Sequence, residues 1–314
     1  MNMIHPNSPL ILEIKGNALD DGPGIRTVVF FKGCPLSCAW CQNPEGRLPV
    51  QELSYEPKLC IECDTCVNTC PEKAISRKNL HFVDRGACTL CQQCFEECPS
   101  GALSAVGRPM TVEQVMDAIL PDQPFFNTSG GGVTLSGGEP AMHMRFTGEL
   151  AEQLHRHDIP VLLETCGYFR LDSFMERVYP HLDTIYYDIK LYDSDRHAHY
   201  CGVDNRMILE NFRCLHDRTG KDGITLLPRV PLVPGITATE ENLRAIAGFL
   251  KEANAPRVQL LPFNPLWPEK ELKVGRPTAF GEETQRASFM AAEEIQRCEE
   301  IFSSMNITPV REAP

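Results

Sequence analysis

Cysteines are crowded into one short part of this chain. Of fifteen cysteines in 314 residues, eleven lie between Cys34 and Cys98. The first residues, MNMIHPNSPL, have neither the basic start nor the apolar core of a signal peptide. Disulfides are rare in the reducing cytosol, where crowded cysteines more often hold metal. We therefore expect a cytoplasmic protein whose chemistry lies in this segment.

Two copies of the run C-x2-C-x2-C-x3-C-P stand at residues 60–71 and 88–99. The run is typical of bacterial ferredoxins with two [4Fe–4S] clusters, in which the fourth cysteine of each copy binds the other cluster. That rule predicts one cluster on Cys60, Cys63, Cys66 and Cys98 and a second on Cys88, Cys91, Cys94 and Cys70. A pair of zinc sites is the alternative, since C-x2-C pairs also bind zinc. The repeated dense run followed by proline favours iron–sulfur clusters, whose chemistry is electron conduction.

Outside this segment, strand and helix patterns alternate. We predict strands at 28–32, 132–136, 159–165, 183–190, 224–233 and 257–263, and helices at 111–120, 143–157, 172–178, 205–217, 239–253 and 282–304. Thr111 and Gln114 are spaced as a capping box. Repeated β–α units imply a parallel sheet, open or closed into a barrel, with its site at the carboxyl ends of the strands. Residues 52–107, rich in Cys, Pro and Glu, are predicted to be an insertion into a barrel made of 1–51 and 108–314.

A third cysteine group, Cys34, Cys38 and Cys41, follows the first predicted strand with no fourth cysteine nearby. Its C-x3-C-x2-C spacing, with Trp40 before the last cysteine, resembles the radical S-adenosylmethionine (radical SAM) superfamily. The resemblance implies that these cysteines hold three irons of a [4Fe–4S] cluster and that the fourth iron binds SAM. Three buried structural cysteines are the alternative. An open coordination position is also the logic of catalytic metal sites.

The resemblance narrows to the activating enzymes of glycyl-radical enzymes, in the subgroup with a two-cluster ferredoxin-like insertion. It rests on DGPGIRTVVFFKGCPLSCAWCQNPE (21–45), SGGGVTLSGGEP (129–140), YYDIKLYD (186–193), GVDN (202–205), RVPLVPG (229–235) and LLPFNPL (260–266). It implies an α/β fold, a partial (β/α)6-type radical SAM barrel with an inserted α+β bacterial ferredoxin-like domain. The implied cofactors are three [4Fe–4S] clusters and SAM.

The implied activity is that of an oxidoreductase. SAM is cleaved to a 5′-deoxyadenosyl radical, which takes hydrogen from a backbone glycine of a partner glycyl-radical enzyme. Reduced flavodoxin or ferredoxin is the implied electron donor, and the enzyme is expected to be a monomer alone. Two alternatives are a radical SAM enzyme acting on a small molecule and, outside enzymes, a ferredoxin-like electron-transfer protein. Neither uses the DGPGIR and YYDIK motifs together.

The family's site residues carry over to matching positions. Gly137, Gly138 and Glu139 of the GGE motif are expected at the methionine amino group of SAM. The D-x-K residues Asp188, Ile189 and Lys190 are expected near its ribose and carboxylate, with Arg229 close to the carboxylate and Trp40, Cys41 and Gln42 on the adenine side. A lysine suits a carboxylate as a point charge.

Four further residues belong to the expected site. Asn264 stands where the family often has histidine near the adenosine, and it can still hydrogen-bond. Asp21 in DGPG is expected to orient the incoming peptide, although an ordinary turn is the alternative. Glu164 and Thr165, together with Asp188, match the residues that bind a monovalent cation in pyruvate formate-lyase activase. Glutamate replaces the aspartate of that enzyme.

Composition argues against two other classes of protein, those that bind nucleic acid and those that span a membrane. The formal charge of −12 argues against nucleic acid as a partner, because phosphate is bound through clustered Lys and Arg. No run approaches the roughly 18 apolar residues of a membrane span. The four remaining cysteines show no ligand spacing and are expected to be small buried hydrophobes: Cys166, Cys201, Cys214 and Cys298.

Overall fold

The computed structural model describes residues 8–265, 267–275 and 288–311. Its main feature is one mixed sheet with the strand order β11-β10-β9-β8-β7-β6-β2-β1-β5, counted over these residues. Seven neighbouring strands run parallel: β2 (Arg26–Phe31), β6 (Gly132–Gly137), β7 (Val161–Thr165), β8 (Thr184–Asp188), β9 (Thr225–Leu232), β10 (Arg257–Pro262) and β11 (Thr308–Val310). The long strand β1 (Leu10–Ala18) pairs antiparallel with β2 and with the short β5 (Arg108–Pro109).

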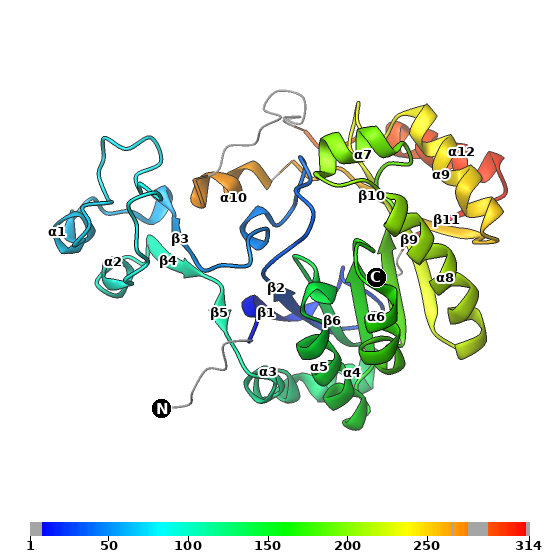
Figure 1. The fold of residues 1–314 in the computed structure, drawn as a ribbon, viewed down its shortest axis with the longest axis horizontal. Coiled ribbons are helices and arrows are strands. Elements are labelled where there is room, and N and C mark those ends of the chain that lie inside the picture. Colours follow the sequence, from blue (N-terminus) through cyan, green and yellow to red (C-terminus); the bar gives the residue numbers. More distant parts are fainter. Residues whose placement is uncertain (1–7, 266, 276–287, 312–314) are drawn as a thin grey trace.

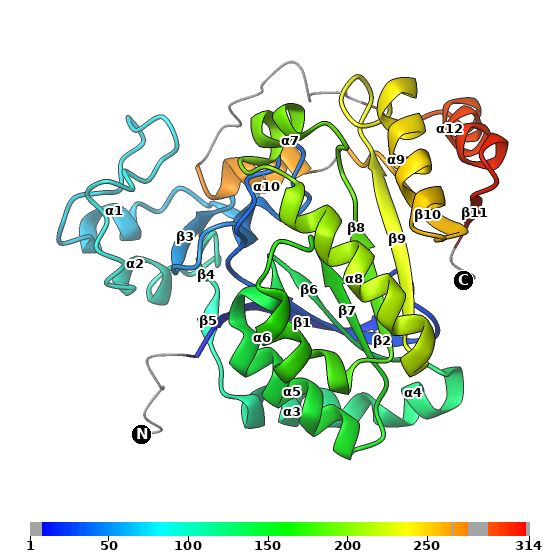
Figure 2. The ribbon, with the colours of Figure 1, turned by 45° about the vertical axis from the view of Figure 1, so that its right-hand side comes forward.

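The parallel sheet predicted from the sequence is confirmed. Central strands such as β2 and β6 are buried almost throughout, because helices cover parallel strands. The connecting helices are α3 (Val112–Ile119), α4 (Gln123–Ser129), α5 (Met144–Arg156), α6 (Leu171–Arg177), α7 (Ser194–Cys201), α8 (Arg206–Asp222), α9 (Glu240–Glu252), α10 (Trp267–Lys273) and α12 (Ala292–Ser304). Figure 2 shows α5, α6 and α8 in front of the strands that they connect. This is the partial α/β barrel architecture expected from the sequence.

Local details also agree with the sequence. Thr111 and Gln114 form the predicted capping box, with the Thr111 hydroxyl accepting from the Gln114 N–H at 3.3 Å and the Gln114 side chain accepting from the Thr111 N–H at 2.9 Å. The last predicted helix (282–304) is observed from Ala292, and its residues 282–287 lie outside the described residues. Strands β1 and β11 and helices α4, α7 and α10 were not predicted. In the described part of the chain no helix is long and apolar enough to span a bilayer.

Residues 52–106 form a separate lobe. The strands β3 (Glu52–Tyr55) and β4 (Leu103–Val106) pair antiparallel at its base, and two short helices, α1 (Thr65–Thr69) and α2 (Gln93–Glu96), lie within the two cysteine runs. The lobe has a small core of its own, including Leu53, Ile75 and Phe82. Figure 1 shows it to one side of the sheet, away from α8, α9 and α12.

Polar contacts fasten this lobe to the sheet. The fully buried Lys32, one residue after β2, binds Glu52 at the start of β3 (Nζ–Oε2 2.7 Å) and the carbonyl of Glu45. On the other side, Arg85 donates to the carbonyls of Leu53 and Lys273, which connects the lobe to the end of α10. The lobe is therefore attached both at the root of the three-cysteine loop and at α10.

Candidate active site

A large hollow lies at the carboxyl ends of the parallel strands. It is open to solvent, and the space within its lining amounts to about 1890 Å³ when the solvent at its mouth is included. Its lining includes most of the residues that the sequence predicted for a SAM site: Asp21, Cys34, Cys38, Trp40, Cys41, Gln42, Gly137, Gly138, Asp188, Lys190, Arg229 and Asn264. Residues from distant parts of the chain therefore meet at one mouth, as the β–α pattern indicated.

The three-cysteine loop is held on both sides by backbone hydrogen bonds. The Cys34 N–H donates to the Arg47 carbonyl at 3.0 Å, which folds the loop back on the chain that follows it. Two further N–H groups, of Ser37 and Ala39, donate to the last residues of α7, the carbonyls of Cys201 (2.8 Å) and Tyr200 (2.9 Å). The loop that carries Cys38 is thus fixed between β2 and α7.

The sulfur atoms of Cys34, Cys38 and Cys41 need a positively charged partner when they are thiolates. Burial, and then the charges of Cys38 and Cys34, raise the pKa of Cys41 to about 12. The hydrogen bond from the Cys201 thiol instead lowers the pKa of Cys38. Three neighbouring thiolates are stable only with positive charge between them, and soft sulfur ligands suit an iron–sulfur cluster. The donor set therefore fits the cluster that the sequence predicts.

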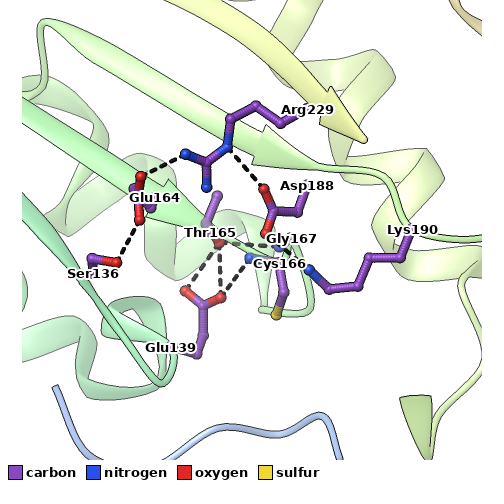
Figure 3. A network of polar contacts seen from close by, with 9 residues as sticks. All are labelled: Ser136, Glu139, Glu164, Thr165, Cys166, Gly167, Asp188, Lys190 and Arg229. Carbon is purple, nitrogen blue, oxygen red and sulfur yellow. Dashed lines mark hydrogen bonds and ion pairs between the residues drawn. The ribbon is translucent and has the colours of Figure 1, made fainter. Parts of the chain in front are cut away.

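A charged network crosses the floor of the hollow (Figure 3). Arg229 on β9 donates to Glu164 on β7 (Nη1–Oε1 2.5 Å) and to Asp188 on β8 (Nε–Oδ1 3.0 Å). Asp188 also accepts from Lys190 (Nζ–Oδ2 2.8 Å), and Glu164 accepts from Ser136 on β6 (2.5 Å). The register explains the arrangement, since Asp188 pairs with Arg229 across two parallel strands and side chains of paired residues share a face.

The network is balanced in charge, with two carboxylates and two cations. Burial works to raise the pKa of Asp188, but attraction from Lys190 and Arg229 prevails and holds its pKa below the usual value. Burial works to lower the pKa of Lys190 and of Arg229, but their carboxylate partners raise the pKa of both. Asp188, Lys190 and Arg229 therefore stay ionised at neutral pH.

Two predicted contact residues do not line the hollow. Glu139 is fully buried, and its carboxylate accepts from the Thr165 hydroxyl (2.9 and 3.0 Å), the Cys166 N–H (2.7 Å) and the Ala141 N–H (3.0 Å). Ile189 is also buried, and its N–H donates to the Arg229 carbonyl at 2.8 Å. The Glu139 side chain and the Ile189 backbone thus hold the walls of the site in place.

Gly138 shows why the GGE segment contains glycines. A Cβ atom at this position would lie 2.2 Å from the Gly33 carbonyl oxygen and 2.8 Å from that of Gly46. The backbone of this segment therefore packs directly against the root of the three-cysteine loop, and a larger residue would push that loop away.

The residues expected on the adenine side lie at one side of the hollow. Trp40 is buried, and the Gln42 amide donates to the Asn264 carbonyl at 3.1 Å. Asn264 is exposed. Asp21 lies in the lining near the start of β2, and its carbonyl accepts from the Thr134 hydroxyl at 2.7 Å. These contacts join the cysteine loop to the segment after β10.

The residues expected to bind a monovalent cation are engaged with protein groups. Glu164 and Asp188 are bridged by the Arg229 guanidinium, and the Thr165 hydroxyl donates to Glu139. The sequence alone did not reveal the bridge, because it depends on the register of three strands.

Two cysteines that the sequence analysis set aside belong to this region. Of the four cysteines expected to be buried, Cys298 is buried, whereas Cys214 is exposed and that expectation was wrong. Cys166, directly after β7, and Cys201, at the end of α7, are buried as expected. They are not remote, however. Both belong to the apolar cluster against which Cys34 and Cys38 of the loop pack. No spacing signal could reveal them, since they come from separate β–α units.

The lobe contains two smaller hollows, each lined by one predicted quartet of cysteines. The first is lined by Cys60, Cys63, Cys66 and Cys98. The second is lined by Cys88, Cys91, Cys94 and Cys70. Across the described residues no three His, Cys, Asp or Glu side chains lie close enough together to hold a single metal ion. In a four-iron cluster each thiolate binds a different iron, which suits wider spacing.

Comparison with known proteins identifies the family. The family model for a 4Fe-4S single cluster domain matches residues 20–192. The chain is 38% identical over 303 residues to the trans-4-hydroxy-L-proline dehydratase activating enzyme of Clostridioides difficile, covering 95% of this chain and 97% of that one. It is 39% identical over 274 residues to the choline trimethylamine-lyase activating enzyme of Oleidesulfovibrio alaskensis, with 85% and 87% covered. It is also 39% identical over 287 residues to the isethionate sulfite-lyase activating enzyme of Nitratidesulfovibrio vulgaris, with 90% and 92% covered.

A solved structure supports the fold. A radical SAM methyltransferase from Sphaerobacter thermophilus matches with a TM-score of 0.53 at 15% identity, covering 96% of this chain and 76% of that one. Together with the hollow and its cysteine loop, the relatives favour the predicted activity over both alternatives. The chain therefore belongs to the activating enzymes of glycyl-radical enzymes, which are radical SAM enzymes that use a [4Fe–4S] cluster and SAM to act on a glycyl-radical enzyme partner.

Proposed function

We propose that Cys34, Cys38 and Cys41 hold the [4Fe–4S] cluster of the activating reaction and that SAM lies beside it in the large hollow. The observation that supports this most is the lining of that hollow, which contains the three cysteines and a charged network together. When bound and reduced, the cluster supplies the electron that cleaves SAM to methionine and the 5′-deoxyadenosyl radical, which takes hydrogen from the partner's glycine.

The chain's own residues bind and orient SAM. Lys190 and Arg229 present positive charge to its carboxylate, and the backbone of Gly137 and Gly138 receives its amino group. Trp40 and Gln42 cover the adenine, with Asn264 beside them. The walls of the site include the buried aromatic side chains of Phe263 and Trp267, which help exclude water from the reacting atoms.

Glu139 and Ile189 act indirectly in this proposal. Glu139 fixes the backbone after β7, and Ile189 holds the D-x-K turn against β9. The position expected for a monovalent cation is taken by the Arg229 guanidinium, which bridges Glu164 and Asp188. We infer that this enzyme uses Arg229 in place of an added cation.

The partner's glycine loop is proposed to reach the hollow past Asp21. Asp20, Asp21 and Lys15 lie together on this side of the lining, near the start of β2. An extended peptide that passes here would bring its backbone to the carboxyl ends of β2 and β6, next to the cysteine loop. Asp21 would then orient the peptide through its N–H groups, which carboxylates accept well.

The two hollows of the lobe are proposed to hold one [4Fe–4S] cluster each, for three clusters in the chain. Residues 52–107 then act as a ferredoxin-like unit. One cysteine of each quartet, Cys63 and Cys91, is exposed. A reduced flavodoxin or ferredoxin could therefore deliver electrons to either cluster at its exposed side. We infer that the enzyme is a cytoplasmic monomer before it meets its partner.

The test is transfer of a radical to a partner. Identities of 38–39% to activating enzymes for three different reactions do not select one substrate. The reconstituted enzyme is therefore mixed anaerobically with SAM, dithionite and, in turn, trans-4-hydroxy-L-proline dehydratase, choline trimethylamine-lyase and isethionate sulfite-lyase. Each mixture is examined by electron paramagnetic resonance. A glycyl-radical doublet with one of them supports the proposal. If none of the three mixtures forms 5′-deoxyadenosine, the proposal is contradicted.

A further inference from the structure

We propose that Lys270 on α10 is a positioning residue for the adenine side of the SAM site and that the lobe holds Lys270 in place, so that contacts of the lobe set the affinity for SAM. The inference rests on the proposed function, in which SAM lies in the large hollow with its adenine covered by Gln42. It gives the lobe a second role besides that of carrying clusters.

Helix α10 depends on its neighbours for its position. It has seven residues (Trp267–Lys273), and a helix this short is not stable in water without tertiary contacts. Its buried residues are Trp267 and Glu271. Figure 1 shows the helix, in orange, between the lobe and the rest of the molecule. The contacts that α10 makes on these two sides therefore decide where its side chains lie.

On one side, α10 is bonded to the chain that follows the last cysteine of the loop. The Lys270 ammonium donates to the Gln42 carbonyl at 3.0 Å and to the side-chain oxygen of Asn43 at 3.1 Å. It also lies 3.6 Å from a carboxylate oxygen of Glu45. Lys270, Gln42 and Asn43 all line the large hollow. One ammonium therefore fixes the backbone that carries the Gln42 side chain, directly after Cys41.

On the other side, α10 is bonded to the lobe. The Nζ atom of Lys273 lies 2.5 Å from Oε2 of Glu56, the residue that follows β3. The Lys273 carbonyl accepts from the Arg85 guanidinium at 3.2 Å. Both contacts hold the carboxyl end of α10, about one turn after Lys270. The lobe thus fixes the part of the helix from which Lys270 reaches the cysteine loop.

The lobe side of this arrangement is separate from the SAM site itself. Glu56 and Lys273 lie outside the lining of the large hollow. A change at this pair therefore acts on SAM through the position of α10 and of Lys270. Coupling between two sites is reciprocal, so that bound SAM should strengthen the attachment of the lobe to α10 by the same factor.

The test is equilibrium binding of SAM to the anaerobically reconstituted enzyme, with iron content measured on the same samples. Lys270→Met removes the ammonium, and Lys270→Arg keeps a positive charge. Glu56→Lys sets two lysines against each other, whereas the double variant Glu56→Lys with Lys273→Glu exchanges the partners and restores the pair. Glu149→Lys is the matched control, because it makes the same change of charge at an exposed ion pair on α5 (Arg145–Glu149, 2.9 Å).

The dissociation constant for SAM should rise about three- to tenfold in Lys270→Met and in Glu56→Lys. Lys270→Arg, the exchanged pair and Glu149→Lys should bind SAM nearly as the wild type does, and all variants should keep their iron. Wild-type affinity in iron-replete Lys270→Met or Glu56→Lys overturns the inference. An exchanged pair that binds SAM no better than Glu56→Lys overturns it as well.

Hydrogen–deuterium exchange of the wild-type enzyme tests the reciprocal effect without any substitution. Addition of SAM should slow the exchange of amides in residues 56–60 and 267–275 and leave exchange in α8 unchanged. If a variant fails to fold, this measurement decides, because the absence of SAM-dependent protection in residues 56–60 overturns the inference. A wild-type enzyme that carries its iron and does not bind SAM contradicts the proposed function instead.

Discussion

Substitution of Arg229 is the most direct way to change the charged network on the floor of the large hollow. Its guanidinium bridges Glu164 and Asp188, and Lys190 supplies the second positive charge. Arg229→Gln changes this balanced set to a net charge of −1 beside the position proposed for the SAM carboxylate. The variant should therefore bind SAM more weakly, while the cysteine loop, held by its own backbone bonds, keeps its cluster.

The magnitude follows from Coulomb's law. At an effective dielectric constant of about 20 and a separation of roughly 6 Å, one unit charge contributes ~3 kcal/mol, which is about 100-fold in affinity. Partial exposure of the network to solvent reduces this effect, since the side chains of Arg229, Glu164 and Asp188 are 10%, 16% and 20% exposed. We therefore expect the dissociation constant for SAM to rise about 10- to 100-fold.

The assay is equilibrium binding of SAM to the anaerobically reconstituted enzyme, with iron content measured on the same samples. The double variant Arg229→Gln with Glu164→Gln restores the charge balance and should recover much of the lost affinity. Potassium ions should improve binding to the single variant and leave the wild type unchanged. Wild-type affinity in an iron-replete Arg229→Gln enzyme would refute the reasoning.

Three other perturbations have defined outcomes. Lys32→Met removes the ammonium that neutralises buried Glu52 and should lower the free energy of unfolding by about 3–5 kcal/mol. In denaturant titrations, the double variant with Glu52→Leu should recover most of that loss. If the effects of the two substitutions on the free energy of unfolding simply add, the two residues do not stabilise the fold as an ion pair. Gly138→Ala should displace the cysteine loop and reduce bound iron by about four atoms per chain. The control Gly220→Ala, with no atom within 4 Å of the new Cβ, should keep all its iron. Equal iron contents in the two variants would contradict the packing argument. Burial lowers the pKa of His197, so the unfolded chain binds more protons and stability should fall as pH drops below about 6.5; His197→Asn should flatten this dependence in thermal unfolding, and an unchanged slope would exclude His197 as its source.

The elements that were predictable have a strong local signal. The central strands β2 and β7 contain the apolar runs VVFF and VLL, and α3 begins with a capping box. Strand β11 is short and contains proline, and α7 is a polar segment without an apolar stripe. Neither could be assigned from local pattern, because tertiary contacts decide such segments.

Some features of the candidate site could likewise be predicted from local sequence patterns, and others could not. The spacing of the cysteines, together with the ferredoxin rule that exchanges the fourth cysteine of each run, indicated which cysteines line each of the three hollows. The inward turn of Glu139, the Arg229 bridge and the contacts of Cys201 depend on pairs separated by 26 to more than 100 residues. Such contacts are set by strand register and helix docking, which a single sequence does not display.

The most direct test of the account measures iron and SAM cleavage together. The wild type and Cys34→Ala are reconstituted and reduced with dithionite under anaerobic conditions, and SAM is added. We expect about 12 irons per wild-type chain, for three four-iron clusters, with 5′-deoxyadenosine formed, and about 8 irons with none formed in the variant. About 8 irons and no 5′-deoxyadenosine from the wild type would contradict a SAM-cleaving cluster on Cys34, Cys38 and Cys41.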